Sequence, residues 1–322
     1  MRIAVIGSGS WGTALAILLG RNGQDVLLLG RDEHELWAMR ETRENPRYLP
    51  GFALPSTVQV EQIDFSAVVD LAIVAVPAGS FREVIAASSI KSPITAIASK
   101  GLDPFTGGLL TETVMDSIPA VFSGPNLAVE IARGIPAVAV AASADLEAAR
   151  LIQDAFSCAT FRVSLSQDVI GVELAGALKN VLAIGGGMSD GLGFGDNTKG
   201  ALLSRGLMEM SRLGVAMGAD LMTFLGPAGV GDLFATAASK LSRNYRVGRM
   251  LGEGMGLADA LASLGQVAEG VPTAHACLSL ARKFETDMPV FAAIDAVIQG
   301  RVDPRTGVSL LMERGSSMRA FV

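Results

Sequence analysis

The stretch RIAVIGSGSWGTALAILLGRNGQDVLLLGRD, residues 2–32, decides the fold of the N-terminal half of the chain. It opens with a short apolar run rich in β-branched residues, which predicts a buried strand. The glycine-rich turn and the apolar segment that follow predict a helix closing near Gly23, and DVLLLGRD predicts a second strand. A strand, a turn, a helix and a second strand in this order are typical of the start of a dinucleotide-binding domain.

The turn before the predicted helix carries Gly7, Gly9 and Gly12, which fit the pattern G-x-G-x-x-G. Glycine at these positions permits a tight turn, close approach of the backbone to a pyrophosphate, and close packing of the helix on the strand. Amide groups at the helix N-terminus then face the phosphates. Because the chain holds 37 glycines, the pattern alone is weak, and the alternative is a plain glycine turn. The flanking strands and helix favour a dinucleotide site.

The end of the second predicted strand bears on the choice of dinucleotide, because Arg31 and Asp32 lie there side by side. An acid at this place accepts a hydrogen bond from the ribose 2′-hydroxyl of NAD, whereas an arginine suits the 2′-phosphate of NADP. Arg31 directly follows the strand, which favours NADP and leaves NAD or dual use open. A solvated turn with an internal charge pair is the alternative interpretation.

Strand-like runs continue to about residue 166, and most are separated by helix-length segments, which is typical of a doubly wound parallel sheet. The further runs are DLAIVAVP (70–77), ITAIAS (94–99), AVFSG (120–124), AVAVAA (137–142) and TFRVS (160–164). Beyond this point the apolar residues follow a helical period. We therefore expect an α/β dinucleotide-binding domain over 1–166 and an all-α substrate and catalytic domain over 167–322. The proline-containing loop over 43–56 is longer than a simple connection needs.

The composition excludes several classes of protein. A formal net charge of −6 argues against a nucleic-acid partner. The two cysteines, Cys158 and Cys277, suggest neither a disulfide framework nor a zinc site, so we expect no metal and a cytoplasmic location. Glycines interrupt the apolar N-terminal run, so we expect neither a signal peptide nor an integral membrane segment.

One charged residue stands out in VELAGALKNVLAIG, residues 172–185. Lys179 has no carboxylate three or four residues away, so it cannot form an ion pair along its own helix. A lysine that reaches solvent from an amphipathic helix is the ordinary alternative, but the surrounding face is small and apolar. Burial would lower the lysine pKa and make it a plausible general base. Its partner must come from elsewhere in the fold, with Asp232 as the first candidate.

The other candidates for chemistry are few. His34 follows the second strand and His275 lies in an amphipathic segment, so elimination favours Lys179 as the base. Ser242 is a good N-cap for a helix on which an anion could bind, next to Arg243 and Asn244. A solvated basic stripe is the alternative, because the basic residues Lys240, Arg243, Arg246 and Arg249 follow helical spacing. Lys100 directly follows a predicted strand, at the edge where α/β sheets bind ligands.

Over essentially its full length the chain resembles the bacterial NAD(P)-dependent glycerol-3-phosphate dehydrogenases. The matching segments include GSGSWGTALA (7–16), NPRYLPG (45–51), ASKGL (98–102), SGPNLAVEIARG (123–134), GVELAGALKNVLAIGGGMSDGLGFGDNTKGALLSRGLMEM (171–210), GVGDL (229–233), SRN (242–244) and VAEGVPTA (267–274). The resemblance implies a Rossmann-type N-terminal domain followed by a helical domain. It also implies reduction of dihydroxyacetone phosphate to sn-glycerol 3-phosphate, for phospholipid synthesis, with NADP or NAD.

The resemblance also implies roles for particular residues. Lys179 is the implied proton acceptor, and Asp232 is expected to orient the lysine or a substrate hydroxyl. The implied cofactor contacts, together with the glycines of the turn, are Ser10, Trp11, Arg31, Lys100, Ala128, Arg243, Val267 and Glu269. The implied substrate contacts are Lys100, Gly124, Asn126, Lys179, Asp232, Ser242, Arg243 and Asn244. The chain departs from the family at Asn126 and Leu127, where Ser or Thr and then Phe are usual, and in the stretch FATAAS after Asp232.

Three alternatives remain open from the sequence. The 6-phosphogluconate and 3-hydroxyacid dehydrogenases also join a dinucleotide domain to a helical domain with a catalytic lysine. GMSDG, residues 187–191, matches the G-x-S-x-G of serine hydrolases, and Ser189, Asp232 and His275 follow the hydrolase order, although that motif needs a strand before the serine. A non-catalytic dinucleotide sensor would keep the glycine turn without needing Lys179.

A homodimer is an expectation that the sequence alone leaves open.

Overall fold

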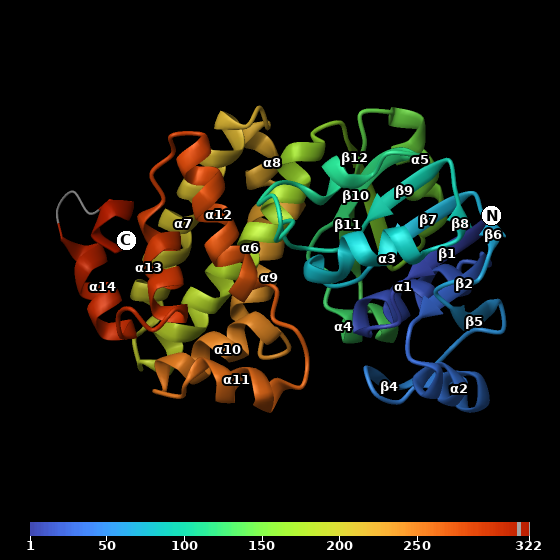
Figure 1. Ribbon diagram of the computed structural model, residues 1–322, viewed down its shortest axis with the longest axis horizontal. Helices are drawn as coiled ribbons and strands as arrows, with labels where there is room; N and C mark the ends of the chain where they lie inside the picture. The colour runs from blue at the N-terminus through green and yellow to red at the C-terminus, as the bar shows by residue number, and fades with distance from the viewer. Residues whose placement is uncertain (314–316, 322) are drawn as a thin grey trace. The chain divides into compact units, whose positions relative to one another are not determined.

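The computed structural model describes residues 1–313 and 317–321. The chain divides into two compact units (Figure 1). The first unit comprises Met1–Ser99 and Leu110–Val169, and the second comprises Lys100–Leu109 and Ile170–Val322. The segment Lys100–Leu109, which precedes the predicted boundary at 166/167, therefore groups with the helical unit.

The first unit is built on one sheet with the strand order β12-β11-β10-β9-β7-β1-β2-β5. The order runs outward from β1 on both sides, so the carboxyl end of β1 lies where the winding reverses. Open α/β sheets bind ligands at this place. The strands of this sheet are β1 (Arg2–Ile6), β2 (Asp25–Gly30), β5 (Val58–Gln62), β7 (Leu71–Val74), β9 (Ile94–Ile97), β10 (Ile118–Ser123), β11 (Ala137–Ala142) and β12 (Phe161–Ser166).

The sheet is mostly parallel, as expected, with one difference from the prediction. Strands β10 and β11 pair antiparallel, and β12 is parallel to β11. A parallel crossover usually needs a full helix to bring the chain back to the starting edge. Between β10 and β11 the chain forms only the short helix α4 (Ala128–Arg133), so the direction of the chain reverses at this point.

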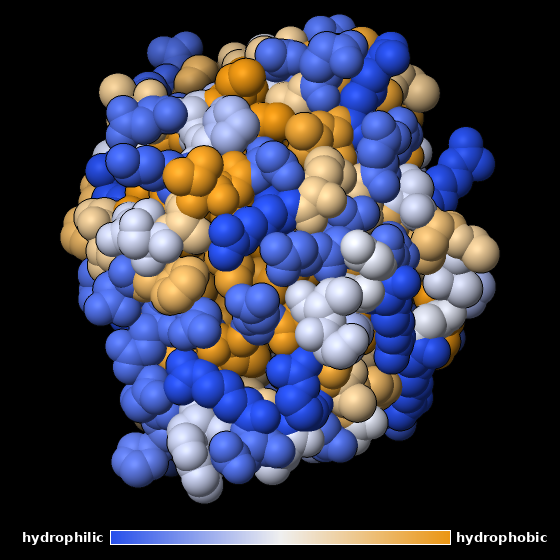
Figure 2. All heavy atoms as spheres, turned by 90° about the vertical axis from the view of Figure 1, so that its right-hand side faces the viewer, coloured by the Kyte–Doolittle hydropathy of each residue, from blue (hydrophilic) through white to orange (hydrophobic). Residues whose placement is uncertain are grey.

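The central strands β1, β2, β7 and β9 are buried on both faces of the sheet, because alternate residues of these strands belong to different cores. Ile3 and Val5 of β1 belong to a core formed with helices on one face, whereas Ala4 and Ile6 belong to a second core on the other. The helices of this unit are α1 (Ser10–Arg21), α2 (Glu33–Thr42), α3 (Phe81–Ala87), α4 and α5 (Leu146–Phe156), with the 3-10 turns η1 (Ala78–Ser80) and η2 (Leu110–Thr113). The face shown in Figure 2 is mostly hydrophilic, with apolar side chains exposed between the polar ones.

The expected loop over 43–56 contains a short antiparallel pair, β3 (Glu44–Asn45) and β4 (Leu49–Ala53). A second short pair joins β6 (Ala67–Val68) to β8 (Ile90–Lys91). The β3–β4 hairpin matters for the site because Asn45, in β3, is buried.

The regular elements of the second unit, within its described residues, are helices and helical turns, and the segment Lys100–Leu109 is a loop (Figure 1). The central helix of this unit is α6, which is buried from Gly171 to Ser189, as expected for a helix that is apolar all round. The elements are α6 (Val169–Gly191), α7 (Asp196–Ala216), α8 (Leu221–Leu225), the π-helical turn η3 (Pro227–Gly231), α9 (Asp232–Ala238), α10 (Arg243–Gly252), α11 (Leu257–Leu264), α12 (Gly270–Lys283), α13 (Pro289–Ile298), α14 (Pro304–Met312) and the 3-10 turn η4 (Met318–Phe321).

Helix α6 is also the one helix in residues 1–313 and 317–321 that is long and apolar enough to cross a membrane. Of the most apolar stretch of 18 residues in this helix, 89% is buried within the protein. The apolar composition of α6 is therefore explained by its place in the core of the helical unit.

Glycines bring α6 and α10 into close contact. Each helix carries a glycine pair at a spacing of four, Gly187 and Gly191 on α6 and Gly248 and Gly252 on α10. A Cβ at Gly248 would lie 1.9 Å from the carbonyl oxygen of Ile184, and one at Gly187 would lie 2.1 Å from that of Tyr245. The two backbones can approach this closely only because these positions lack side chains, and the contact fixes α10 against the helix that carries Lys179.

Candidate active site

Lys179 lies in the middle of α6 with its side chain 7% exposed. Its Nζ donates to Oδ1 of Asp232 at 2.9 Å and to Oγ1 of Thr236 at 2.6 Å. The ion pair expected between Lys179 and Asp232 is present. Since the lysine has no partner on its own helix, the fold provides one from α9.

Asp232 joins two lysines. Its Oδ2 accepts a hydrogen bond from Nζ of Lys100 at 2.8 Å, while Oδ1 accepts from Lys179. Thr236, one turn later on α9, donates to Oδ1 of Asp232 at 3.1 Å. One buried ammonium group, one partly buried ammonium group and one buried carboxylate thus lie together. Such burial is costly for isolated charges but tolerable when they pair and bond to one another.

The electrostatics of this cluster suit proton transfer at Lys179. Burial lowers the pKa of Lys179 to about 8, the carboxylate of Asp232 opposes this shift, and the positive charge of Lys100 adds to it. Burial alone would raise the pKa of Asp232, but the two lysines together hold it below its usual value. The carboxylate therefore stays ionised, and the amine can gain or lose a proton near neutral pH.

A chain of amides ties the surrounding segments together. Asn180, next to Lys179, donates to the carbonyl oxygen of Lys100 at 3.0 Å. Its Oδ1 accepts from Nδ2 of Asn244 at 2.9 Å, and Oδ1 of Asn244 accepts from the backbone amide of Gly270 at 2.9 Å. Both ends of the Asn244 side chain are thus engaged within the protein, where they hold α6, α10 and α12 in register.

The N-terminus of α10 forms as the sequence predicts. Ser242 is the N-cap, and its hydroxyl oxygen accepts from the amide of Tyr245 at 3.2 Å. Arg243 is exposed and donates to Oε1 of Gln266 at 3.4 Å. The surrounding protein lowers the pKa of the Arg243 guanidinium, and Glu269 opposes this effect. Val267 is half-exposed on the same segment as Glu269, the residue that precedes α12.

In the first unit the glycine turn has the shape that a dinucleotide requires. Gly7 has φ +118°, and a Cβ at Gly12 would lie 1.8 Å from the carbonyl oxygen of Gly7. A Cβ at Gly9 would meet nothing within 4 Å, and no side chain caps α1 there. The turn is therefore closed where helix packs on strand and open at the helix N-terminus, as a pyrophosphate group needs.

Three side chains hold this turn in place. Asn45 is buried and donates from Nδ2 to the carbonyl oxygen of Ser8 and to Oγ1 of Thr13, both at 2.8 Å. Ser10 donates to the carbonyl oxygen of Tyr48 at 2.7 Å, and Trp11 donates from Nε1 to that of Ala98 at 3.2 Å.

Arg31 and Asp32, which follow β2, lie in different environments. Arg31 is 56% exposed and has Glu83 as its ion-pair partner at 3.5 Å. Asp32 is the N-cap of α2, where its Oδ1 accepts from the amides of His34 and Glu35. The guanidinium therefore remains accessible, whereas the carboxylate is already engaged by the helix.

The remaining predicted residues of the first unit lie after β10. Gly124 has φ +153°, and a Cβ there would lie 2.8 Å from the carbonyl oxygen of Val138. Asn126 donates from Nδ2 to the same oxygen at 2.9 Å, and its buried Oδ1 has no hydrogen-bond partner among the described residues. Ala128 is the first residue of α4.

The serine hydrolase interpretation is wrong. Ser189 is 2% exposed and lies in the continuous helix α6, without the strand and sharp turn that expose a nucleophile. His275 is near Asp295, at 3.9 Å, and Asp232 is bound by the two lysines. The glycines of GMSDG serve the packing of α6 on α10.

Sequence reasoning missed Thr236, Asn180 and Asn45. Thr236 lies one helical turn after Asp232, so its spacing could have placed it on the same face. Asn180 is adjacent to Lys179, and Asn45 opens the long loop, but only the fold shows what either side chain meets. No group of three or more His, Cys, Asp or Glu side chains within the described residues could hold a metal ion.

Comparisons with known proteins bear on this site. Residues 2–149 match the family described as NAD-dependent glycerol-3-phosphate dehydrogenase N-terminus, and residues 168–309 match the corresponding C-terminus. A glycerol-3-phosphate dehydrogenase (NAD(P)+) of Desulfitobacterium hafniense is 42% identical over 322 residues, covering 98% of this chain and 92% of that protein. The chain belongs to the NAD(P)-dependent glycerol-3-phosphate dehydrogenases. The predicted family is confirmed, which decides against the other dehydrogenase classes and the non-catalytic sensor.

Solved structures agree with this assignment of the dehydrogenase. A glycerol-3-phosphate dehydrogenase from Coxiella burnetii aligns with TM-score 0.91 and 36% identity, covering 97% of this chain and 99% of that one. The protein named GPD1 from yeast aligns with TM-score 0.77 and 26% identity over 97% of this chain and 99% of that one. D-mandelate dehydrogenase, at 12% identity and TM-score 0.64, shares the fold only. The predicted fold class is confirmed.

Proposed function

We propose that this dehydrogenase interconverts dihydroxyacetone phosphate and sn-glycerol 3-phosphate with Lys179 as the group that gives and takes the proton. The observation that carries the proposal is the buried cluster in which Asp232 bridges Lys179 and Lys100. NAD(P), when bound, supplies or accepts the hydride at substrate C2. In the reductive direction Lys179 donates a proton to the C2 oxygen, and in the oxidative direction it removes one.

Asp232 is proposed to keep Lys179 oriented and charged for proton donation. Without the carboxylate, burial and the neighbouring Lys100 would lower the pKa of Lys179 further. Thr236 contacts both members of the pair and restricts the direction of Nζ. Lys100, released in part from Asp232, can also bind the C2 oxygen and stabilise the charge that develops on it.

The substrate phosphate is proposed to bind at the N-terminus of α10. Backbone amides and helix polarity favour an anion there, and Arg243 adds a planar group suited to phosphate oxygens. Ser242 and Asn244 shape this end of the helix through the cap and the amide chain. Gly124 and Asn126 remain proposed substrate contacts from the first unit, where Oδ1 of Asn126 is the atom that needs a partner.

The proposed cofactor contacts are the glycine turn with its neighbours and a smaller set in the helical unit. They comprise Gly7, Gly9, Ser10, Trp11, Gly12, Arg31, Lys100, Ala128, Arg243, Val267 and Glu269. We propose NADP as the preferred cofactor because Asp32 is engaged as a helix cap and Arg31 is accessible. One oxygen of the acid that would recognise the NAD ribose thus accepts the bonds of the helix cap, and the residue that would bind a 2′-phosphate is accessible.

The test is a steady-state assay of dihydroxyacetone phosphate reduction with NADPH and with NADH. We expect turnover with both and a higher kcat/KM for NADPH, which Arg31→Gln reverses. Lys179→Ala should abolish turnover while leaving cofactor binding largely intact, because the glycine turn lies in the other unit. Normal turnover by a folded Lys179→Ala protein would refute the proton-transfer role.

We also propose a homodimer and a cytoplasmic location. Large apolar side chains are exposed on α7, α8 and α9, elements that pack on one another directly or through η3; they are Met208 (64%), Met222 (66%), Leu225 (52%) and Phe234 (72%). Apolar surface of this kind is typical of an interface between subunits. Cys158 and Cys277 are free thiols, which suits a reducing compartment.

A further inference from the structure

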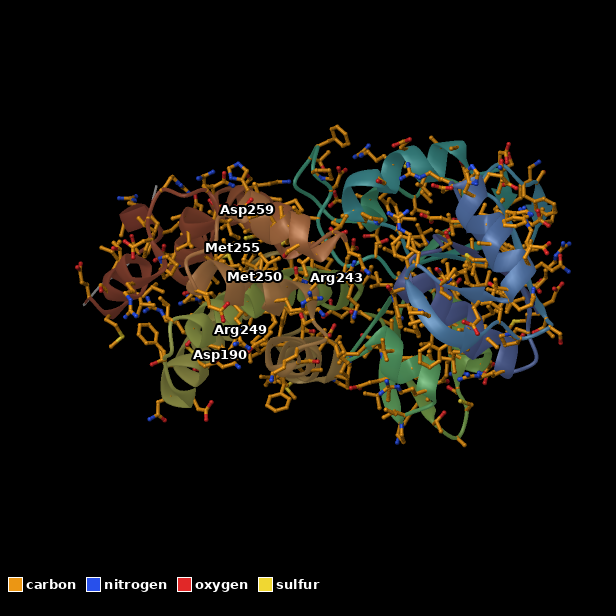
Figure 3. All side chains as sticks on the ribbon, turned by 90° about the horizontal axis from the view of Figure 1, so that it is seen from below. Asp190, Arg243, Arg249, Met250, Met255 and Asp259 are labelled. Atoms are coloured by element: carbon orange, nitrogen blue, oxygen red, sulfur yellow. The ribbon has the colours of Figure 1, made fainter. Side chains whose placement is uncertain are left out.

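Basic residues on both sides of the proposed phosphate-binding end of α10, Lys240 before it and Arg246 and Arg249 after it, line a separate hollow. Its volume is about 290 Å³, and its lining residues are Lys240, Tyr245, Arg246, Arg249, Met250 and Glu253. None of them belongs to the lysine cluster or to the Ser242–Asn244 end of the helix. Figure 3 shows Arg249 beside Asp190, with Arg243 farther along at the other end of α10.

The hollow has more positive charge than its neighbours neutralise. Three cations and one carboxylate line it, which leaves an excess of two positive charges in a protein of net charge −6. Arg249 has Glu253 as an ion-pair partner at 2.8 Å. Lys240 and Arg246 are exposed and have no ion-pair partner within residues 1–313 and 317–321.

The nearby acidic residue, Asp190, interacts with Arg249 and leaves Lys240 and Arg246 without a counter-charge among the described residues. Asp190, at the end of α6, accepts from the hydroxyl of Tyr245 and from Nζ of Lys199, each at 2.7 Å. Lys199 also lies 5.2 Å from the centroid of the Tyr245 ring. The Tyr245 side chain is therefore held in place at the side of the hollow. Asp190 is paired with Lys199, which does not line the hollow.

We infer that this hollow binds a soluble phosphate-bearing small molecule, at a second anion site on α10 distinct from the proposed substrate site. Arg246 and Arg249 offer planar guanidinium groups that can each donate two hydrogen bonds to phosphate oxygens. Lys240 adds an ammonium group on a flexible side chain. The Tyr245 ring and the Met250 side chain provide apolar contact for the carbon skeleton that carries the phosphate. An anion relieves the mutual repulsion of the lining cations, which gives the site its driving force.

The test is calorimetric titration of the full chain with inorganic pyrophosphate in an Arg243→Gln background, which weakens the proposed substrate phosphate site, with NADPH present at saturation so that the glycine turn is occupied. We expect one remaining site, whose affinity falls about tenfold or more when Lys240→Gln and Arg246→Gln are added, since two charge-assisted contacts are lost. Lys91→Gln, at another exposed lysine, is the matched control and should change nothing. Both target side chains are exposed, and circular dichroism checks that each variant is folded.

Three results would overturn the inference. One is the absence of pyrophosphate binding in Arg243→Gln, which would assign all anion binding to the substrate site. Another is equal affinity with and without Lys240 and Arg246. The third is binding to phosphatidylglycerol vesicles that depends on these cations while pyrophosphate fails to bind, which would make the surface a membrane contact. Lys179→Ala should leave pyrophosphate binding unchanged, so failure of the catalytic proposal is distinguishable from failure of this one.

Discussion

Lys179 is a buried charged residue in a stretch of α6, residues 174–189, that has no other charged side chain. The sequence indicates that the lysine is important because no carboxylate lies three or four residues away on its own helix. The structure adds the partner, Asp232, and a pKa lowered by burial to about 8. The pKa of this amine therefore depends on burial and on a carboxylate 53 residues later in the chain.

The pKa of Lys179 predicts opposite pH profiles for the two directions of the reaction. Oxidation needs the neutral amine, so kcat/KM for sn-glycerol 3-phosphate should rise with pH and level off above about 8. Reduction needs the protonated amine, so kcat/KM for dihydroxyacetone phosphate should fall above about 8. Initial rates between pH 6 and 10 measure both profiles. Two profiles with the same slope would contradict the assignment of the base.

Replacing Asp232 by Asn should move this ionisation to lower pH. The carboxylate raises the pKa of Lys179, so its removal leaves burial and the charge of Lys100 to lower the pKa further. We expect turnover to fall by roughly a hundredfold or more because a supporting group of the proton donor is lost. Thr236→Val keeps both charges and serves as the comparison, with a smaller shift of the oxidation profile. An unshifted profile in folded Asp232→Asn would show that the two groups are not coupled.

The candidate site was only partly predictable from the sequence. Lys179, Asp232 and the cap at Ser242 follow from spacing, from elimination and from the resemblance to the family. The side chains of Thr236 and Asn180 bond to groups on other segments, and a sequence does not show which segments the fold brings together. Asn244 illustrates the limit: its type suggests a ligand contact, but its side chain joins Asn180 to Gly270.

At the scale of elements, the crossing of α6 and α10 positions the site. The glycines at Gly187, Gly191, Gly248 and Gly252 allow backbone contact, and the same two helices carry Lys179 and the cap at Ser242. A shift of α10 would change the distance between the proposed base and the proposed phosphate site.

Gly248→Ala should therefore reduce both stability and activity. The added Cβ would lie 1.9 Å from the carbonyl oxygen of Ile184, so one helix must move. We expect a loss of about 1–3 kcal/mol in the free energy of unfolding and a raised KM for dihydroxyacetone phosphate. Gly200→Ala on α7 is the control, because its Cβ would meet nothing within 4 Å and should stabilise the helix by roughly 0.5–1 kcal/mol. Urea unfolding and steady-state kinetics give both values, and an unchanged KM in Gly248→Ala would argue against the positioning role.

A second prediction at this scale concerns Glu209, a fully buried carboxylate on α7 that accepts from the amides of Val290 and Phe291 at the start of α13. Burial raises the pKa of Glu209 to about 7, and the bonds from these amides oppose the shift. The native state thus keeps a proton that the unfolded chain releases near its ordinary pKa, so stability falls as pH rises from about 4.5 to about 7.

Glu209→Gln removes this titration and should flatten that part of the stability profile. The difference in the free energy of unfolding between Glu209→Gln and the parent should therefore shift in favour of the variant as pH increases from 5 to 7, by an amount on the order of 3 kcal/mol or less. Differential scanning calorimetry measures it. A difference that is constant with pH would show that Glu209 does not titrate in this range.

At the scale of the molecule, the sequence predicted the two architectures but not all of their connections. Strong apolar runs such as those of β1 and β2 identify a central sheet because they are buried on both faces. The reversed strands β11 and β12 were not predictable, since composition does not encode strand direction. β5 was not predicted, although its valines alternate with polar residues, because a run of five residues is short and holds only two apolar side chains.

The proposed homodimer predicts a mass near twice the 33.3 kDa of one chain in light scattering coupled to size exclusion. Met222→Glu together with Phe234→Glu should yield the monomer, because charges placed in an apolar interface are costly to bury. Trp37→Glu, in the first unit and 60% exposed, is the matched control and should leave the mass unchanged. A parent protein that elutes with the mass of one chain would refute the dimer.

The segment Lys100–Leu109 belongs to the helical unit although it lies inside the first half of the chain. It brings one of the two lysines on Asp232 and the carbonyl oxygen that binds Asn180. The helical unit is consequently not one continuous stretch of the chain. A chimera that fuses residues 167–322 to an unrelated nucleotide-binding domain would carry Lys179 without Lys100. An exchange between dehydrogenases therefore preserves the proposed active site only if it includes Lys100–Leu109 together with the helical residues.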